Sequence, residues 1–380
     1  MFLDDARRRQ RETIAFLREM VECESPSGDA GAVNRFGDLF AERVADVATV
    51  KRVAGGKYGK HLLCRFRLRG QKKSAGRVMA LGHSDTVWPM GTLRAMPWRE
   101  EKGRLWGPGV LDMKAGLAFF VTAMRILRDA DVAAPAEVLL QINSDEEVGS
   151  HSSRALTEEN ARASKAVLVL EPGTGLSGKL KTARKGVGGM RVEVRGVSSH
   201  AGIDISAGAN AAVELAWQIG KIGRFTNLRR GVTVNVGVIG GGTRTNVVPA
   251  EAWAEIDYRI PRLADYEPLM AQFAGLATRD KRCSLTVSGE LNRPPFERTA
   301  AVRELFGVAR RVAAGIGVEL EESATGGGSD GNFTGAIGVP TLDGLGGVGE
   351  GAHAAHESIL VDRVADRVAL LAGLVAELGR

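Results

Sequence analysis

The sequence predicts an α/β protein in which a mostly parallel sheet, covered by helices on both faces, is interrupted by a smaller inserted α+β domain. Short, almost wholly apolar segments alternate with helical patterns in the first half of the chain. From about residue 183, the apolar residues instead alternate strictly with polar ones. A chain of 380 residues is also long enough for two domains.

The first domain is predicted from apolar runs without polar alternation, which are typical of parallel strands buried on both faces. These runs lie at residues 77–82, 137–142, 165–170 and 339–342. Helical spacing of apolar residues predicts helices at 12–22, 30–44, 114–127, 299–315 and 361–378. We therefore expect residues 1–182 and 296–380 to form one catalytic domain.

The inserted domain, residues 183–295, is predicted from strands with one polar face. Strict alternation at 190–195, 232–238 and 254–260 indicates three strands, and a fourth is expected at 284–287. Helices are predicted at 207–221 and 264–277. The order β-α-β-β-α-β is that of a ferredoxin-like unit, and Arg293-Pro294-Pro295 marks its end.

Composition excludes several classes of protein. Hydrophobic residues make up 44% and charged residues 25%, as in ordinary globular proteins. No apolar stretch is long enough to span a membrane, and the N-terminus lacks the apolar core of a signal peptide, so a cytoplasmic protein is expected. The net charge of +6 comes without a basic and aromatic stripe. It therefore favours small anionic substrates over nucleic acid.

Chemistry-bearing residues follow three of the predicted parallel strands. His83 and Asp85 follow the first, Glu146 and Glu147 the second, and Glu171 the third. Ligands bind beyond the carboxyl ends of such strands. We therefore expect these side chains to gather in one crevice.

Two further motifs supply Asp112, ahead of a helix, and His353. Clustered carboxylates repel one another unless a cation neutralises them, and sets of His, Asp and Glu without thiolate suit Zn²⁺, with Mn²⁺ or Co²⁺ as alternatives. Each residue alone has a simpler interpretation: His83 as a structural histidine, Glu146-Glu147 as a solvated acidic turn, and Asp112 as a helix N-cap. Their joint occurrence at strand ends favours a site for two divalent ions.

These motifs resemble those of the di-zinc metallopeptidases, a family that includes glutamate carboxypeptidase, aminoacylase and succinyl-diaminopimelate desuccinylase. The resemblance covers nearly the whole chain, in order. It is strongest to the glutamate carboxypeptidase branch. The matching motifs are Gly-His83-Ser-Asp85, Leu-Asp112-Met-Lys, Asp-Glu146-Glu147-Val-Gly-Ser, Leu-Glu171-Pro, Ser-His200-Ala-Gly, His353-x-x-x-Glu357 and Gly328-Ser-Asp.

The resemblance implies a role for each matching residue of the first domain. Asp112 would bridge two metal ions, with Glu146 as general base and Asp85 orienting the imidazole of His83. The first ion would be completed by His83 and Glu171, and the second by Glu147 and His353. His356 is an alternative ligand in the last motif, but the family spacing to Glu357 selects His353.

In the inserted domain, the resemblance implies a dimerisation domain, or lid, and therefore a homodimer. His200 would reach the partner subunit's active site and polarise the scissile carbonyl. Asn246 and Arg259 would hold a terminal carboxylate of the substrate, with backbone N–H groups near Gly328. Arg259 as a solvated strand residue, and residues 326–328 as a plain flexible loop, are the alternatives.

The expected reaction is hydrolysis of an amide bond next to a free carboxylate, on a small N-acyl amino acid or peptide. An aminoacylase or N-acyl amino acid deacylase of the same family is the alternative within the enzymes. A catalytically silent relative that acts as a binding protein is the alternative outside them, although the full set of Glu146 and ligands argues against it.

Overall fold

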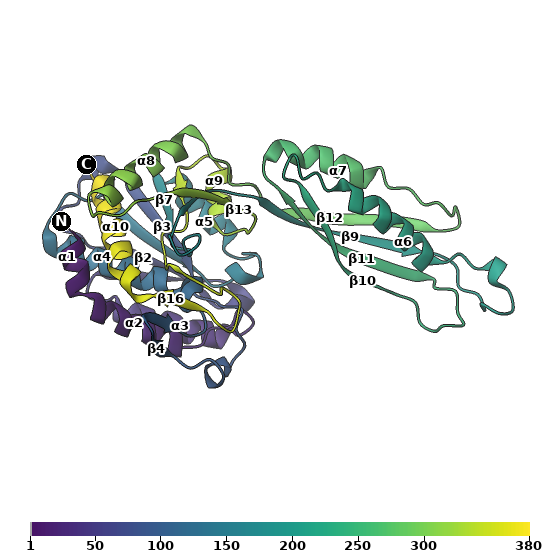
Figure 1. Cartoon of the computed structure of the whole chain (residues 1–380), viewed down its shortest axis with the longest axis horizontal. Coiled ribbons are helices and arrows are strands. Elements are labelled where there is room, and N and C mark those ends of the chain that lie inside the picture. Colours follow the sequence, from purple (N-terminus) through teal and green to yellow (C-terminus); the bar gives the residue numbers. More distant parts are fainter. Residues whose placement is uncertain (1) are drawn as a thin grey trace. The chain divides into compact units, whose positions relative to one another are not determined.

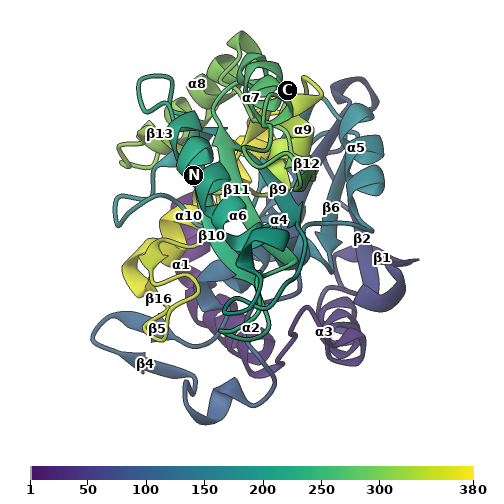
Figure 2. The same cartoon turned by 90° about the vertical axis from the view of Figure 1, so that its right-hand side faces the viewer.

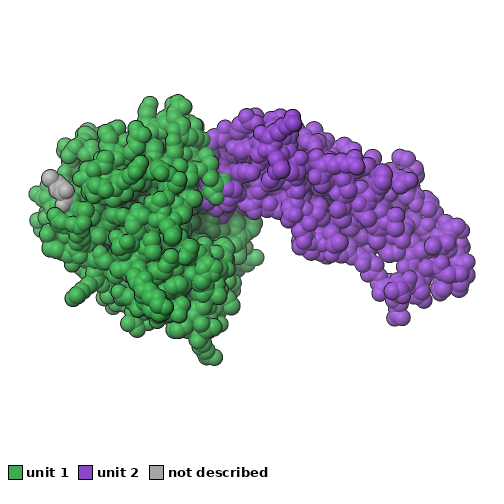
Figure 3. Space-filling model, in the orientation of Figure 1, with its two compact units in different colours: residues 1–183, 298–325, 329–380 green, residues 184–297, 326–328 purple. Residues whose placement is uncertain are grey.

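The structure is a computed structural model that describes residues 2–380 (Figure 1). The chain forms two compact units (Figure 3). The first unit contains the residues up to 183 together with 298–325 and 329–380. The second contains residues 184–297 and also 326–328. Residues 326–328, predicted from sequence to belong with the first unit, group with the second because Arg184 donates hydrogen bonds to the carbonyl oxygens of Gly327 and Gly328.

The first unit is built on a six-stranded sheet in the order β1-β2-β6-β3-β7-β14. Its strands are β1 Ala48–Ala54, β2 Lys60–Phe66, β3 Arg77–His83, β6 Glu137–Asn143, β7 Ala166–Val169 and β14 Thr341–Leu342. Its helices are α1 Phe2–Arg8, α2 Gln10–Glu22, α3 Ala30–Arg43, α4 Ala115–Ala130, α5 Arg154–Arg162, α8 Ala300–Ala314, α9 Gly331–Ala336 and α10 Val364–Glu377.

Alternate residues of β3 show why the central strands are apolar throughout. Val78 and Ala80 belong to the large core that also contains α4 and α10. Met79 and Leu81 belong to a smaller core on the other face, with Ala161 of α5. Strands β6, β3, β7 and β14 pair in parallel. The predicted mostly parallel sheet with helices on both faces is confirmed.

The sheet also has an antiparallel edge that the apolar runs did not predict. β1 pairs antiparallel with β2, and β2 antiparallel with β6. Helix α3 lies beside this edge (Figure 2), and its Phe36 and Phe40 join Leu62 of β2 in the large core. β1 gave no apolar run because it is largely exposed and Thr49, Lys51 and Arg52 interrupt its apolar residues.

Short strands complete the first unit. β4 Arg99–Glu101, β5 Arg104–Trp106, β15 Gly349–Glu350 and β16 Ser358–Leu360 form a small antiparallel sheet. β8 Leu180–Arg184 pairs with β13 Glu322–Thr325. Strands of two to five residues contain too few side chains for a periodic signal.

The second unit is a four-stranded antiparallel sheet in the order β10-β11-β9-β12. Its elements are β9 Gly186–Arg195, α6 Ala211–Ile222, β10 Thr233–Gly241, β11 Glu251–Ile260, α7 Tyr266–Ala274 and β12 Ser284–Arg293. Both helices cover the same face of the sheet (Figure 1). Strand β11 alternates buried with more exposed residues, as predicted for a strand with one polar face.

Among the described residues, no helix combines the length and the apolar character needed to cross a bilayer.

Candidate metal centre

The candidate site lies at the carboxyl ends of neighbouring strands of the central sheet. His83 is the last residue of β3 and is in register with Asn143, the last residue of β6. Glu171 follows β7, the neighbour of β3 on its other side. Because parallel strands end at the same edge of a sheet, residues far apart in sequence come together here.

The imidazole of His83 is buried and oriented by its own loop. Its Nδ1 lies 2.9 Å from the backbone carbonyl oxygen of Asp85, and the Asp85 carboxylate lies 3.5 Å away. Its Nε2 lies 3.4 Å from Asp112 Oδ1 and 3.5 Å from Glu171 Oε1. This Nε2 has no hydrogen-bond partner among the described residues. A buried nitrogen facing two carboxylates in this way is the arrangement that a cation would complete.

Asp112 lies in a wide helical turn, Val110–Lys114, directly ahead of α4. Its backbone is not helical, with φ −113° and ψ 92°, and its side chain does not cap α4. Oδ1 faces His83, whereas Oδ2 lies 3.2 Å from His353 Nε2. One carboxylate thus presents its two oxygens to two different imidazoles, the geometry expected of a bridge between two cations.

Glu147 and His353 form the second side of this arrangement. Glu147 Oε2 lies 3.3 Å from His353 Nε2, and Oε1 is buried without a hydrogen-bond partner among the described residues. Both histidines of the 351–357 loop are exposed, and the contacts described from this loop to Asp112 and Glu147 come from His353. A carboxylate oxygen of Glu146 lies within 4.8 Å of ligand atoms of both His83 and Glu171.

The charges of the cluster shift the pKa values of its members. Burial raises the pKa of Glu147 to about 7, despite the hydrogen bond to His353. Hydrogen bonds to Asp112 and Glu147 raise the pKa of His353 to about 10. Burial by itself would lower the pKa of His83, but contacts led by Asp112 raise it well above its usual value. The carboxylates of the site are therefore stabilised by positive charge. Bound divalent cations would supply that charge while the histidines stay neutral.

The residues present fit a pair of divalent cations. Two imidazoles and three carboxylates surround the site without a thiolate, a donor set suited to Zn²⁺ and also to Mn²⁺ or Co²⁺. His83, Asp112 and Glu171 could hold one cation, while Asp112, Glu147 and His353 could hold the other.

The turn that carries Glu146 and Glu147 directly follows β6 and is held by Asp85. The Asp85 carboxylate accepts the backbone N–H groups of both glutamates at 3.2 Å and the hydroxyl of Ser27 at 2.7 Å. Asp85 therefore contacts His83 with its carbonyl oxygen and this turn with its carboxylate. It connects two strand ends of the site.

His61, on β2, supports the same turn and was not anticipated from the sequence. Its buried Nδ1 accepts the backbone N–H of Ser144 at 3.1 Å. Because an amide N–H can only donate, Nδ1 is unprotonated and the neutral ring carries its proton on Nε2. Nε2 then donates to Ser152 Oγ, whose hydroxyl donates to Asp145. In this tautomer His61 is not a base for Ser152, and the network is structural.

A predicted catalytic residue, His200, and a predicted substrate-binding residue, Asn246, meet at one end of the inserted unit. The segments containing His200 and Asn246 pair through a bridge between His200 and Val247. The backbone N–H of Ala201 also donates to the carbonyl oxygen of Asn246 at 2.9 Å. Both His200 and Asn246 are exposed. This end of the unit thus presents an imidazole and an amide side chain together.

Arg259 lies near the opposite end of β11, which begins five residues after Asn246. Its guanidinium pairs with Asp257 at 2.7 Å and lies 3.4 Å from the carbonyl oxygen of Gly326. Gly328 packs closely, since a Cβ there would lie 2.8 Å from Arg293 Cδ. At about 3.3 Å per residue, the eight steps along β11 from Glu251 to Arg259 separate Arg259 from the strand end nearer Asn246 by about 26 Å. One chain therefore cannot bring both side chains to one small ligand.

Glu357 is another buried residue of the site to which the sequence assigned no role. Its carboxylate accepts the backbone N–H groups of Leu111 and Asp112 at 2.9 and 3.0 Å. The available signal was its place in the His353-x-x-x-Glu357 motif. That spacing alone does not reveal which backbone groups the carboxylate reaches.

Comparison with known proteins agrees with this geometry. The profile of "Peptidase family M20/M25/M40" matches residues 79–377. The chain belongs to this family. It is therefore a hydrolase of the metallopeptidase and amidohydrolase class, as its motifs predict. Members of the family depend on metal ions, and the His and carboxylate cluster is consistent with this.

Relatives of known name cover almost the full length of the chain. Carboxypeptidase G2 of Pseudomonas sp. (strain RS-16) is 28% identical, over 97% of this chain and 90% of the relative. Succinyl-diaminopimelate desuccinylase of Acidovorax ebreus (strain TPSY) is 29% identical, over 88% of this chain and 90% of the relative. At these identities the family is shared, while the substrate is not determined.

Solved structures share the fold. Aminopeptidase PepT from Bacillus cereus superposes with a TM-score of 0.83 at 23% identity, covering 98% of this chain and 99% of that one. Human carnosine dipeptidase 1 superposes with a TM-score of 0.70 at 16% identity, covering 100% and 99%. These similarities confirm the predicted class of fold, including a separate sheet unit inserted in the catalytic one.

Proposed function

We propose that this M20 hydrolase cleaves an amide bond next to a free carboxylate, in the manner of a glutamate carboxypeptidase. The observation that carries the proposal is the placement of Asp112, whose two oxygens face His83 and His353 separately. In this proposal His83, Asp112 and Glu171 hold one divalent ion, and Asp112, Glu147 and His353 hold the other. Zn²⁺ is the proposed metal, with Mn²⁺ and Co²⁺ as alternatives.

The residues around the cations have distinct proposed tasks. When bound, such cations polarise a substrate carbonyl and promote the ionisation of water near neutral pH. Glu146 takes the proton of the attacking water on its carboxylate and returns it to the leaving nitrogen. Asp85 positions the backbone of Glu146 through the hydrogen bond to its N–H. His200 donates a hydrogen bond to the oxygen on which negative charge develops.

The substrate is proposed to be a small N-acyl amino acid or peptide. Asn246, Arg259 and the backbone near Gly328 would hold its terminal carboxylate. Arg259 already pairs with Asp257, so a substrate carboxylate would have to share or displace that partner. The resemblance of the motifs to the glutamate carboxypeptidase branch favours an acyl-glutamate, and the similarity to a carboxypeptidase supports cleavage next to a free carboxylate. A desuccinylase or aminoacylase reaction is the alternative, and the desuccinylase relatives at similar identity support it.

We propose a homodimer formed through the inserted unit. Arg259 lies near one end of β11 and His200 and Asn246 lie beyond the other end, so in this proposal a second copy supplies His200 and Asn246. Strand β10 is an edge of its sheet and exposes Val238 and Ile239. An unpaired strand edge with apolar side chains favours pairing with another copy.

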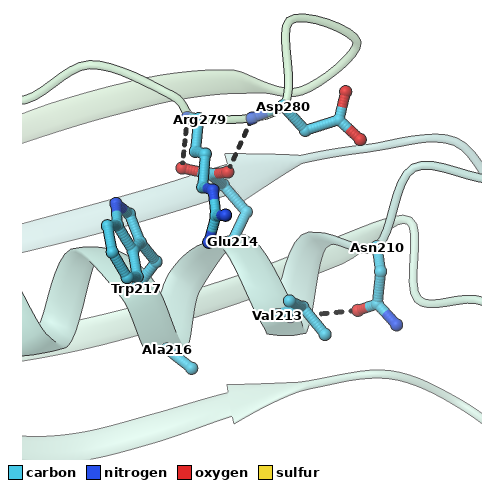
Figure 4. Close-up of a pocket in the computed structure, with 7 residues that line it drawn as sticks. All are labelled: Asn210, Val213, Glu214, Ala216, Trp217, Arg279 and Asp280. Atoms are coloured by element: carbon cyan, nitrogen blue, oxygen red, sulfur yellow. Dashed lines mark hydrogen bonds between the residues drawn. The ribbon is translucent and has the colours of Figure 1, made fainter.

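The helix beside this edge offers a matching apolar surface. Val213 and Trp217 of α6 are exposed, and α6 packs on β10 and β11. Val213 and Trp217 line a surface pocket (Figure 4). Its other lining residues are Asn210, Glu214, Ala216, Arg279 and Asp280. The exposed side chains of Val213 and Trp217 and the edge of β10 form the proposed surface of the dimer.

The proposal is tested by restoring metal to chelated protein in the presence of candidate substrates. Zn²⁺, Mn²⁺ or Co²⁺ is added back, and the release of free amino acid is followed for acyl-glutamates, N-succinyl and N-acetyl amino acids, and dipeptides. We expect cleavage that needs the metal and a free carboxylate beside the amide. Full activity in metal-free protein, or equal cleavage of the carboxyl-amidated substrates, would contradict it.

A further inference from the structure

The carboxylate of Glu357 accepts hydrogen bonds from several backbone N–H groups of the loop that carries Asp112. Oε1 accepts the N–H groups of Leu111 and Asp112 at 2.9 and 3.0 Å. Oε2 accepts the N–H of Gly109 at 2.9 Å and the indole Nε1 of Trp88 at 2.8 Å. The side chain is buried. Four donors on one buried carboxylate hold it, and the loop, in one position.

Glu357 also belongs to the loop that carries His353. β15 and β16 pair antiparallel, with Glu350 opposite Ser358, so residues 351–357 form the loop of a hairpin. This loop contains two tight turns. The N–H of Ala354 donates to the carbonyl oxygen of Gly351, and the N–H of Glu357 donates to the carbonyl oxygen of Ala354. His353 therefore lies within the hairpin loop that Glu357 closes.

We propose that Glu357 is a positioning residue that holds the Asp112 loop against the His353 hairpin and thereby sets the affinity for the cation pair. This inference rests on the proposed metal-dependent function. His353 Nε2 and Asp112 Oδ2 lie on the two segments that Glu357 joins. Partners that orient metal ligands in this way typically change metal affinity 10- to 100-fold when they are removed.

The substitution Glu357→Gln separates this role from simple packing. Glutamine has nearly the same shape, but its NH₂ group would face two of the N–H donors instead of accepting from them. Part of the loop at 109–112 would lose its anchor while the volume of the core is kept. We expect the affinity for Zn²⁺, measured by competition with a chromophoric chelator, to fall about 10- to 100-fold. Activity should recover at high Zn²⁺ concentration.

A matched control exists in the inserted unit. Glu214 of α6 is also buried and accepts backbone N–H groups, from Arg279 at 3.0 Å and Asp280 at 3.1 Å (Figure 4). Glu214→Gln removes the same kind of interaction in the unit that contains none of the proposed metal ligands. We expect it to lower thermal stability and leave Zn²⁺ affinity unchanged.

A second variant distinguishes position from charge. Glu357→Asp keeps the negative charge but is one methylene too short to reach all four donors. If Glu357 acts by position, this variant loses Zn²⁺ affinity as Glu357→Gln does. Unchanged affinity in Glu357→Gln, or wild-type affinity in Glu357→Asp, would overturn the inference. Failure of the wild-type protein to bind Zn²⁺ at all would instead overturn the proposed function.

Discussion

At the scale of single residues, the candidate site is defined by which atom of each side chain faces which neighbour. The Asp85 carboxylate accepts the backbone N–H groups of Glu146 and Glu147. These hydrogen bonds hold the backbone of both glutamates and do not involve their carboxylates, which face the candidate metal site. Adjacent residues can therefore take the different tasks proposed for them, Glu147 as a metal ligand and Glu146 as a base.

Replacing Glu146 by glutamine tests the division of tasks. Because glutamine cannot take up a proton, we expect kcat to fall by roughly 10²–10⁴. Both metals should be retained, since the proposed ligands are untouched. Steady-state kinetics together with elemental analysis measure the two effects. Unchanged turnover would remove Glu146 from the role of base, and loss of metal would make it a ligand.

The two histidines of the 351–357 loop provide a second test with an internal control. His353→Ala should lose about one of the two metals, because His353 contacts both Asp112 and Glu147. His356→Ala should keep both, because the contacts described from this loop to Asp112 and Glu147 come from His353. Elemental analysis after dialysis measures the content. Full metal content in His353→Ala, or equal loss in both variants, would refute the assignment.

At the scale of elements, charged groups hold the start of α7 in the inserted unit. Asp265 precedes α7 and its buried carboxylate accepts hydrogen bonds from Arg230 and Arg262. Burial by itself would raise the pKa of Asp265, but these hydrogen bonds outweigh it and lower the pKa. A lowered folded-state pKa means that the ionised carboxylate favours the folded state. This contribution is present above the usual aspartate pKa and is lost as pH falls through the folded-state value.

Asp265→Asn should therefore weaken α7 near neutral pH. We expect a loss of about 2 kcal/mol of protection against hydrogen exchange over residues 266–274, typical of hydrogen bonds to a charged group. The difference in protection between Asp265→Asn and the wild type should become smaller once pH falls below about 4, because the wild-type carboxylate then takes up a proton. The control Asp38→Asn removes an exposed ion pair with Arg52. We expect it to change hydrogen-exchange protection little, because exposed ion pairs contribute little stability. A difference that stays constant with pH would contradict the electrostatic explanation.

At the scale of the whole molecule, the proposed dimer supplies side chains that one chain cannot bring together. The proposal requires that His200 of one copy act with Glu146 of another. Each subunit then depends on its partner for part of its site. In such an arrangement a single subunit is inactive, and activity requires the dimer.

Mixing two inactive variants tests this dependence. Dimers of Glu146→Gln and dimers of His200→Ala are each expected to be nearly inactive. After dissociation and reassociation, mixed dimers contain one site with an intact Glu146 and the partner's His200. Random pairing should restore about a quarter of wild-type activity. A mixture of Glu146→Gln with His353→Ala is the control and should restore none, because both changes act within one subunit.

The sequence by itself determined the parallel strands, the inserted ferredoxin-like unit and the family of this protein. Apolar runs and strict alternation report local burial, and motifs after strands such as Gly-His83-Ser-Asp85 follow the geometry of a parallel sheet. The resemblance of the motifs also implied that Asp112 lies between His83 and His353, whereas tertiary structure alone decided that Glu357 holds the Asp112 loop and that β1 and β2 complete the sheet. These features depend on contacts between segments distant in sequence, and neither periodicity nor spacing encodes such contacts.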